Sequence, residues 1–187
     1  MKLKKSISAV LATVMLLSAS CGESSAKERE LSKEIVSYDY KYKIETPVDW
    51  KLDESAEVKN NESITLYAIC DERCIVLGAG VTEIDQDMLP FNNFCNMVIK
   101  NINSKYFTTV SAGDFTEKDV NGLKMRYLEI QNLTFSDSEE EIRAWCYIGE
   151  IDGFYVMFIA ETLESLASDK QREEVEMIIS TFQRFEV

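Results

Sequence analysis

Cysteine is the side chain with the greatest potential for chemistry in this sequence, which contains five cysteines and no histidine. Without histidine, the chain cannot form a Ser-His-Asp or Cys-His catalytic arrangement, or a histidine-ligated zinc site. Paired carboxylates and Ser-Lys arrangements stay open as catalytic groups, since 33 residues are acidic. We find no catalytic motif, metal site or cofactor site, and an enzyme is disfavoured.

The first cysteine, Cys21, ends a segment typical of a secreted protein. A head with three lysines precedes an apolar run over residues 7–17, and small residues occupy positions 18–20. The apolar run has the length of the hydrophobic region of a signal peptide. It is too short for a membrane-spanning helix, which needs about twenty residues.

This segment resembles the bacterial lipoprotein signal, in which the cysteine becomes a lipidated N-terminus. The usual pattern has leucine three places before the cysteine, whereas here Ser18 stands there and Leu17 lies one place further back. The resemblance implies a signal peptide over residues 1–20, lipid attachment at Cys21 and an extracytoplasmic domain on a membrane anchor. Each buried methylene of such a lipid adds about 0.8 kcal/mol of membrane affinity. The alternatives are an ordinary signal peptide and a spanning helix.

Two of the other four cysteines are spaced so that they could form a disulfide. Cys70 and Cys74 flank the charged residues 71–73, between two apolar runs that predict a hairpin. Residues that face each other across such a hairpin have Cα atoms about 4.5–5.5 Å apart, within reach of a disulfide. We therefore predict a Cys70–Cys74 disulfide, with Cys95 and Cys146 as buried free thiols. A fully reduced set and a four-thiolate metal site are the alternatives.

Charge and length limit the partners and the number of domains. The chain of 187 residues has a formal net charge of −13, and the three lysines of the leader are lost on cleavage. Nucleic acid is excluded as a partner, because no basic patch is present to neutralise phosphates. Residues 21–34 are polar after the cysteine and predict a flexible tether, and residues 35–187 predict one domain.

Several segments predict strands and turns. Alternation over residues 36–45 predicts one strand with Tyr38, Tyr40 and Tyr42 on a single face. The pairs Asn121–Gly122 and Asp152–Gly153 each predict a tight hairpin turn between strands. The apolar phase shifts between residues 127 and 128, which indicates a bulge or a strand buried on both faces.

Two segments predict helices. Apolar residues at helical spacing within residues 85–106 predict the first helix, with Asp87 as its N-cap. A metal site at Asp85 and Asp87 is the alternative. The second helix spans residues 168–185, with a capping box at Ser168 and Gln171. Its buried stripe consists of Val175, Ile178, Ile179 and Phe182.

The order strands, helix, strands, helix predicts an α+β fold: a largely antiparallel sheet with helices packed on it. Pro47 and Trp50, the Asn121–Gly122 turn, the DGFYV motif (152–156) and the IISTFQRF motif (178–185) resemble the PsbP-like superfamily, which includes DcrB-like bacterial lipoproteins. The resemblance implies an α/β/α sandwich and a non-enzymatic binding or assembly role. It transfers no site residue, because these motifs are structural.

The expected function is a lipid-anchored binding or accessory module of the cell envelope that docks a protein partner. One alternative is a carrier of a small ligand or metal ion, suggested by the tyrosines and by the acidic loop over residues 136–141. The other alternative is a hydrolase that uses paired carboxylates.

Overall fold

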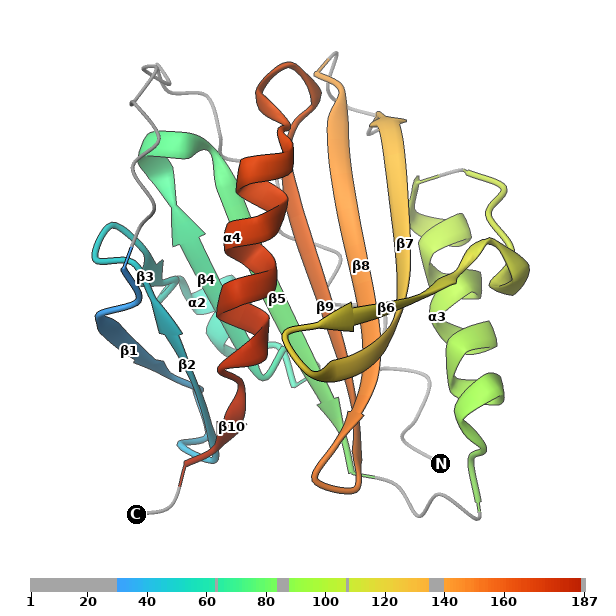
Figure 1. Cartoon of the computed structure of the whole chain (residues 1–187), viewed down its shortest axis with the longest axis horizontal. Coiled ribbons are helices and arrows are strands. Elements are labelled where there is room, and N and C mark those ends of the chain that lie inside the picture. The colour runs from blue at the N-terminus through green and yellow to red at the C-terminus, as the bar shows by residue number, and fades with distance from the viewer. Residues whose placement is uncertain (1–29, 63, 84–87, 107, 135–139, 186–187) are drawn as a thin grey trace.

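The structure is a computed structural model that describes residues 30–62, 64–83, 88–106, 108–134 and 140–185. Its elements form three layers (Figure 1). A large antiparallel sheet lies in the middle, with one long helix on one face and a second helix with a small sheet on the other. The predicted α+β sandwich is therefore confirmed.

The central sheet has seven strands, and every neighbouring pair is antiparallel. In spatial order the strands are β3 (Lys51–Leu52), β4 (Leu66–Cys70), β5 (Ile75–Thr82), β9 (Phe154–Leu163), β8 (Ile142–Ile151), β7 (Leu123–Leu133) and β6 (Thr116–Val120). The small sheet has the order β1 (Lys33–Val36), β2 (Tyr42–Thr46) and β10 (Gln183–Arg184).

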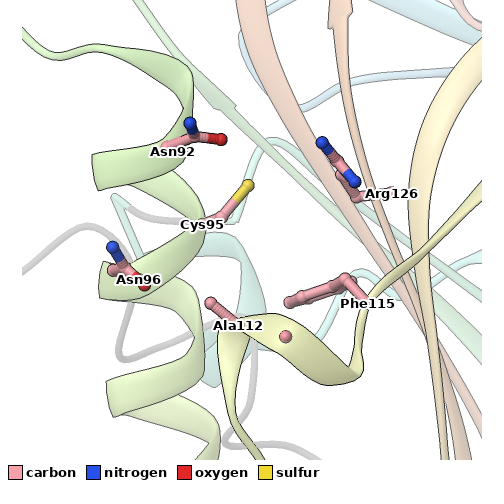
Figure 2. A pocket seen from close by; sticks show the side chains of 7 residues that line it. Asn92, Cys95, Asn96, Ala112, Phe115 and Arg126 are labelled. Atoms are coloured by element: carbon pink, nitrogen blue, oxygen red, sulfur yellow. The ribbon is translucent and has the colours of Figure 1, made fainter.

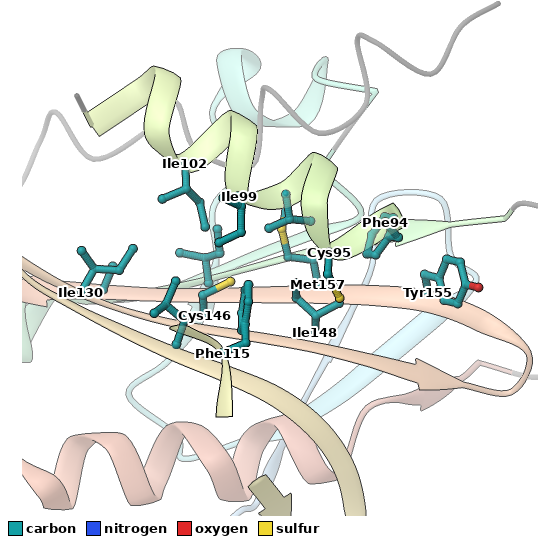
Figure 3. Packing of buried hydrophobic residues seen from close by; sticks show 14 of the residues in the cluster. Phe94, Cys95, Ile99, Ile102, Phe115, Ile130, Cys146, Ile148, Tyr155 and Met157 are labelled. Carbon is teal, nitrogen blue, oxygen red and sulfur yellow. The ribbon is translucent and has the colours of Figure 1, made fainter. Parts of the chain in front are cut away.

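The described part of the chain contains the helices α2 (Ala56–Lys59), α3 (Phe91–Tyr106) and α4 (Asp169–Ser180). The apolar stripe of α3 packs on one face of the central sheet, where Figure 3 shows its side chains meeting those of β7, β8 and β9. The stripe of α4 packs on the opposite face. Both helices match the predicted periodicity, although the predicted N-cap Asp87 and its partner Asp85 lie outside the described residues.

The central strands β8 and β9 are buried on both faces of the sheet. Cys146 and Ile148 face α3, while the alternating Trp145 and Tyr147 face α4. The same arrangement explains the phase shift in β7, since Tyr127 packs toward α4 and Leu128 toward α3. A strand covered on both sides carries apolar residues at successive positions instead of alternate ones.

The two predicted tight turns are confirmed. Asn121 and Gly122 have φ values of 50° and 95°, and Asp152 and Gly153 have φ values of 52° and 79°. Two successive residues with positive φ form the turn whose twist matches that of a hairpin, which is why Asn-Gly and Asp-Gly pairs favour it. These turns connect β6 to β7 and β8 to β9.

The strand predicted over residues 36–45 is wrong, because a turn divides it into β1 and β2. The Ser37 hydroxyl accepts hydrogen bonds from the backbone N–H groups of Lys41 and Tyr42, at 3.1 and 3.0 Å. Tyr40 adopts a left-handed φ of 58° and is 71% exposed. The tyrosines therefore do not share a face: Tyr38 contacts the cluster under α3, and Tyr42 lies in the cluster under α4.

The last helix begins as predicted and ends earlier. Ser168 is its N-cap and accepts the N–H of Gln171 at 3.3 Å. The helix stops at Ser180, and β10 follows where residues up to 185 were predicted to be helical. Phe182, just beyond the helix end, is buried with the rest of the predicted stripe.

Candidate binding site

The predicted disulfide between Cys70 and Cys74 is not formed, since Cys70 is a free thiol in the structure. In the register of β4 and β5, Cys70 faces Ile75. The connection between these two strands therefore contains four residues, 71–74, instead of the predicted three. Cys74 is the additional residue and has a left-handed φ of 50°. A shift of one residue removes a side chain from the cross-strand position that a hairpin disulfide requires.

Cys70 belongs instead to a cluster that connects the 3-10 turn η1 (Asp71–Arg73) to α4. Its Sγ donates to a carboxylate oxygen of Asp49 at 3.2 Å and accepts from Nε of Arg73 at 3.3 Å. The guanidinium of Arg73 also donates to both carboxylate oxygens of Glu174, at 2.6 and 2.7 Å. Trp50 donates its indole N–H to the same carboxylate at 2.9 Å. These contacts hold the β4–β5 hairpin against α4.

The free thiols of Cys70, Cys95 and Cys146 are protonated at neutral pH. Burial raises the pKa of Cys70 to about 11, although Arg73 acts in the opposite direction. Burial also raises the pKa values of Cys95 and Cys146. The thiolate is the nucleophilic and metal-binding form of cysteine. Cys95 and Cys146 are thus buried free thiols, as predicted.

A second charged cluster lies between α4 and strands β7 and β8. Arg143 contacts Glu129 at 3.0 Å and also binds Glu164, while Arg172 lies 3.8 Å from Glu129. The hydrogen bond from Arg143 lowers the pKa of Glu164. A hydrolase with paired carboxylates needs one acid whose pKa is raised so that it can donate a proton. This cluster therefore has the chemistry of an ion-pair network.

A pocket of about 320 Å³ opens between α3, the 3-10 turn η2 (Ala112–Asp114) and β7 (Figure 2). The residues that line it are Asn92, Cys95, Asn96, Ala112, Gly113, Phe115 and Arg126. Phe115 and Cys95 are buried in the cluster under α3 and provide apolar surface. Asn92, Asn96 and Arg126 provide polar groups. Apolar walls with a few polar groups are typical of small-molecule sites.

Hydrogen bonds hold the η2 wall of this pocket in place. The Asn103 side chain of α3 donates to the carbonyl of Val110 at 2.7 Å and accepts the Val110 N–H at 2.8 Å. The N–H of Ser111 donates to the Asp114 carboxylate at 2.5 Å. These bonds join the segment before η2 to α3, so the pocket is formed before any ligand arrives.

The pocket was not predicted from the sequence, and the predicted site residues Cys70 and Cys74 do not line it. Cys21 lies outside the described residues. Cys95 was predicted only as a buried thiol, and its position on the apolar stripe of α3 gave no indication of a cavity. Asn92 and Asn96 flank that stripe one turn apart, which is the only local signal for the site.

Within the described ranges, no three Asp, Glu or Cys side chains gather as they would around a metal ion. The acidic loop over residues 136–141, which suggested the metal-carrier alternative, lies largely outside those ranges. No helix in the described part of the chain combines the length and apolar character that crossing a membrane requires.

Comparisons of the sequence with protein-family models and with curated proteins find no match. Solved structures do match. A protein from Bacteroides thetaiotaomicron aligns over 84% of this chain with a TM-score of 0.56 and 11% identity, and the chain spans only 50% of that protein. Cyanobacterial PsbP (CyanoP) from Synechocystis aligns over 87% of this chain and 98% of its own, with a TM-score of 0.52 and 17% identity.

The Ran-binding protein Mog1p from Saccharomyces cerevisiae also aligns, over 82% of this chain and 95% of its own, with a TM-score of 0.51 and 12% identity. At these identities the comparisons concern the fold. The agreement with CyanoP extends over nearly the whole of both chains. The chain therefore has the PsbP-like fold that its motifs indicated.

Proposed function

We propose that the protein is a lipid-anchored, non-enzymatic module of the bacterial cell envelope that docks a protein partner. The observation that carries the proposal is the fold, which the chain shares with Mog1p, a Ran-binding protein. The leader and Cys21 support the anchor and an extracytoplasmic location. The partner is a protein and not nucleic acid, because the chain is strongly acidic.

The described side chains support binding without catalysis. The sequence has no histidine, and burial raises the pKa values of Cys70, Cys95 and Cys146. The partly buried Glu129 and Glu164 are in contact with Arg143. Catalytic groups need a pKa close to the working pH, whereas these groups are held away from it or paired.

The anchor has a direct test. Replacing Cys21 with alanine is expected to move the protein from the membrane pellet to the soluble fraction, because the site of lipid attachment is lost. Ser18→Leu is the matched control: it restores leucine three places before the cysteine and is expected to leave the protein in the membrane. Fractionation and immunoblotting measure the distribution. A Cys21→Ala protein that still pellets after a high-salt wash contradicts the anchor.

The partner is tested by crosslinking in native envelopes. The wild-type protein is expected to give a discrete crosslinked species of defined mass. An excess of purified Cys21→Ala protein should compete for the partner and remove that species, since the domain surface is unchanged. Mass spectrometry identifies the partner. Crosslinks that are spread over abundant lipoproteins and resist competition would end the docking proposal.

A second candidate function is the carriage of a small ligand. The pocket between α3 and η2 favours it, because its volume of about 320 Å³ and its mixed lining suit a small molecule. This function and partner docking are compatible, since a module can present a bound ligand to its partner.

A further inference from the structure

The charge of the pocket is opposite to that of the molecule. The chain has a net charge of −13, and acidic residues outnumber basic ones by 33 to 20. Yet none of the described residues that line the pocket is acidic, and Arg126 is the only charged residue among them. A local positive charge determines what binds at short range, because salt screens distant surface charges beyond roughly 8–10 Å.

Arg126 has hydrogen-bond donors to offer a ligand. It lies on the face of β7 that is directed toward α3, opposite Glu117 of β6. Its one ion pair in the described residues is with Glu117, whose carboxylate is 3.5 Å away and 83% exposed. Such a surface pair contributes little, about 0–1 kcal/mol. A guanidinium has five N–H donors, so most of its capacity is available to the pocket.

The opposite wall supplies neutral polar groups above an apolar floor. Asn92 and Asn96 lie one turn apart on α3, and both carboxamides are at the exposed rim. Cys95, between them, directs its sulfur toward the Arg126 side of the pocket (Figure 2). Phe115 is 7% exposed and adds apolar surface to the lining. A ligand would thus meet donors at the rim and apolar atoms below.

We infer that this pocket binds a small organic carboxylate with an apolar body, an inference that rests on the ligand-carrier function proposed above. The planar fork of a guanidinium matches the two oxygens of a carboxylate. A metal cation would find no acidic ligand among the described residues of this lining. A phosphate dianion would find one positive charge and an apolar floor, which leaves much of its charge without compensation.

The inference is tested with three probes of one shape: benzoate, neutral benzamide and cationic benzamidine. Two-dimensional NMR of the 15N-labelled Cys21→Ala protein follows the backbone amides during titration. Benzoate is expected to shift the amides of residues 92–96 and 112–115, and to bind at least ten-fold more tightly than benzamide. Benzamidine is expected not to bind, because Arg126 repels it.

Matched variants on strands β6 and β7 assign the effect to Arg126. Arg126→Met is expected to reduce benzoate affinity at least ten-fold, to the level of benzamide, and Arg126→Lys to reduce it less. Lys124→Met removes the same charge from an exposed position two residues away on the same face, and should leave affinity unchanged. Glu117→Gln should increase affinity two- to three-fold, because it removes the competing carboxylate. A purely structural role for Arg126 would not produce this increase.

The outcomes separate this inference from the proposed functions. Equal binding of benzoate and benzamide, or benzoate binding that survives Arg126→Met, overturns the carboxylate inference and leaves ligand carriage standing. If no probe binds at millimolar concentration while the amides of the pocket are assigned, both carboxylate binding and ligand carriage are overturned. Partner docking is tested by crosslinking and is not affected by either result.

Discussion

Replacing Phe182 with alanine is expected to lower the free energy of unfolding by about 3–5 kcal/mol. The ring of Phe182 stacks on Tyr42 of the small sheet, with centroids 5.3 Å apart. It also packs in a T-shaped arrangement with the ring of Phe158 of the central sheet, with centroids 5.1 Å apart. The side chain thus joins the C-terminal end of α4 to both sheets, and alanine would leave a cavity among rigid elements that cannot close around it.

Urea denaturation of the soluble Cys21→Ala protein measures this effect. The midpoint should fall while the dependence of unfolding free energy on urea stays constant, as expected when only stability changes. Phe185→Ala is the matched control, since Phe185 lies three residues later, is half-buried and has the Lys43 ammonium 5.6 Å from its ring. We expect a loss of about 1 kcal/mol or less for this control. A similarly small loss for Phe182→Ala would contradict its role in the core.

The correctly predicted parts of the fold depend on chemistry that is local in the chain. The Asn121–Gly122 and Asp152–Gly153 turns follow from the positive φ that each pair accepts. The stripes of α3 and α4 follow from the helical period, and Ser168 caps α4 through a group only three residues away. Such signals need no knowledge of the tertiary structure, because both partners lie within one turn or one hairpin.

Where the predictions failed, one residue or one distant contact decided the structure. The pattern around Tyr38, Tyr40 and Tyr42 alternates like a strand, but the Ser37 hydroxyl stabilises a turn. A single additional residue in the β4–β5 connection separated Cys70 from its predicted partner. Alternation alone cannot distinguish one strand from two strands joined by a turn when polar and apolar residues alternate through both. It also cannot distinguish a loop of three residues from a loop of four.

The pocket could not be predicted because its walls come together only in the folded chain. Asn92 and Arg126 come from α3 and β7, and η2 reaches them through the Asn103 contact to Val110. Their residue types are common on protein surfaces and form no spaced motif. The contact between Arg73 and Glu174 spans 101 residues and was equally invisible in the sequence.

The same Arg73–Glu174 contact leads to the second large expected effect. The side chain of Arg73 is 13% exposed and that of Glu174 is 9% exposed, so neither charge has much water to replace a lost partner. Arg73→Met is expected to lower the free energy of unfolding by about 3–5 kcal/mol, because it leaves a buried carboxylate without its cation. Lys51→Met is the control. Lys51 forms an ion pair with Asp71, which lies in the same 3-10 turn as Arg73, but the side chains of Lys51 and Asp71 are both more than half exposed. That variant should cost less than about 1 kcal/mol.

The double variant Arg73→Met, Glu174→Gln separates the value of the ion pair from the penalty of breaking it. Glutamine keeps the shape of Glu174 and an oxygen that accepts the Trp50 N–H, which now lies 2.9 Å from the carboxylate. Nε of Arg73 also lies 3.3 Å from the carboxylate of Asp49, whose side chain is 13% exposed, so Asp49 loses this cation in both the single and the double variant. The double variant removes the other buried carboxylate charge, that of Glu174, and should therefore be more stable than Arg73→Met alone. Urea unfolding of the two single variants and the double variant gives the coupling free energy. Losses that simply add would show that Arg73 acts through Asp49 and Cys70 and not through Glu174.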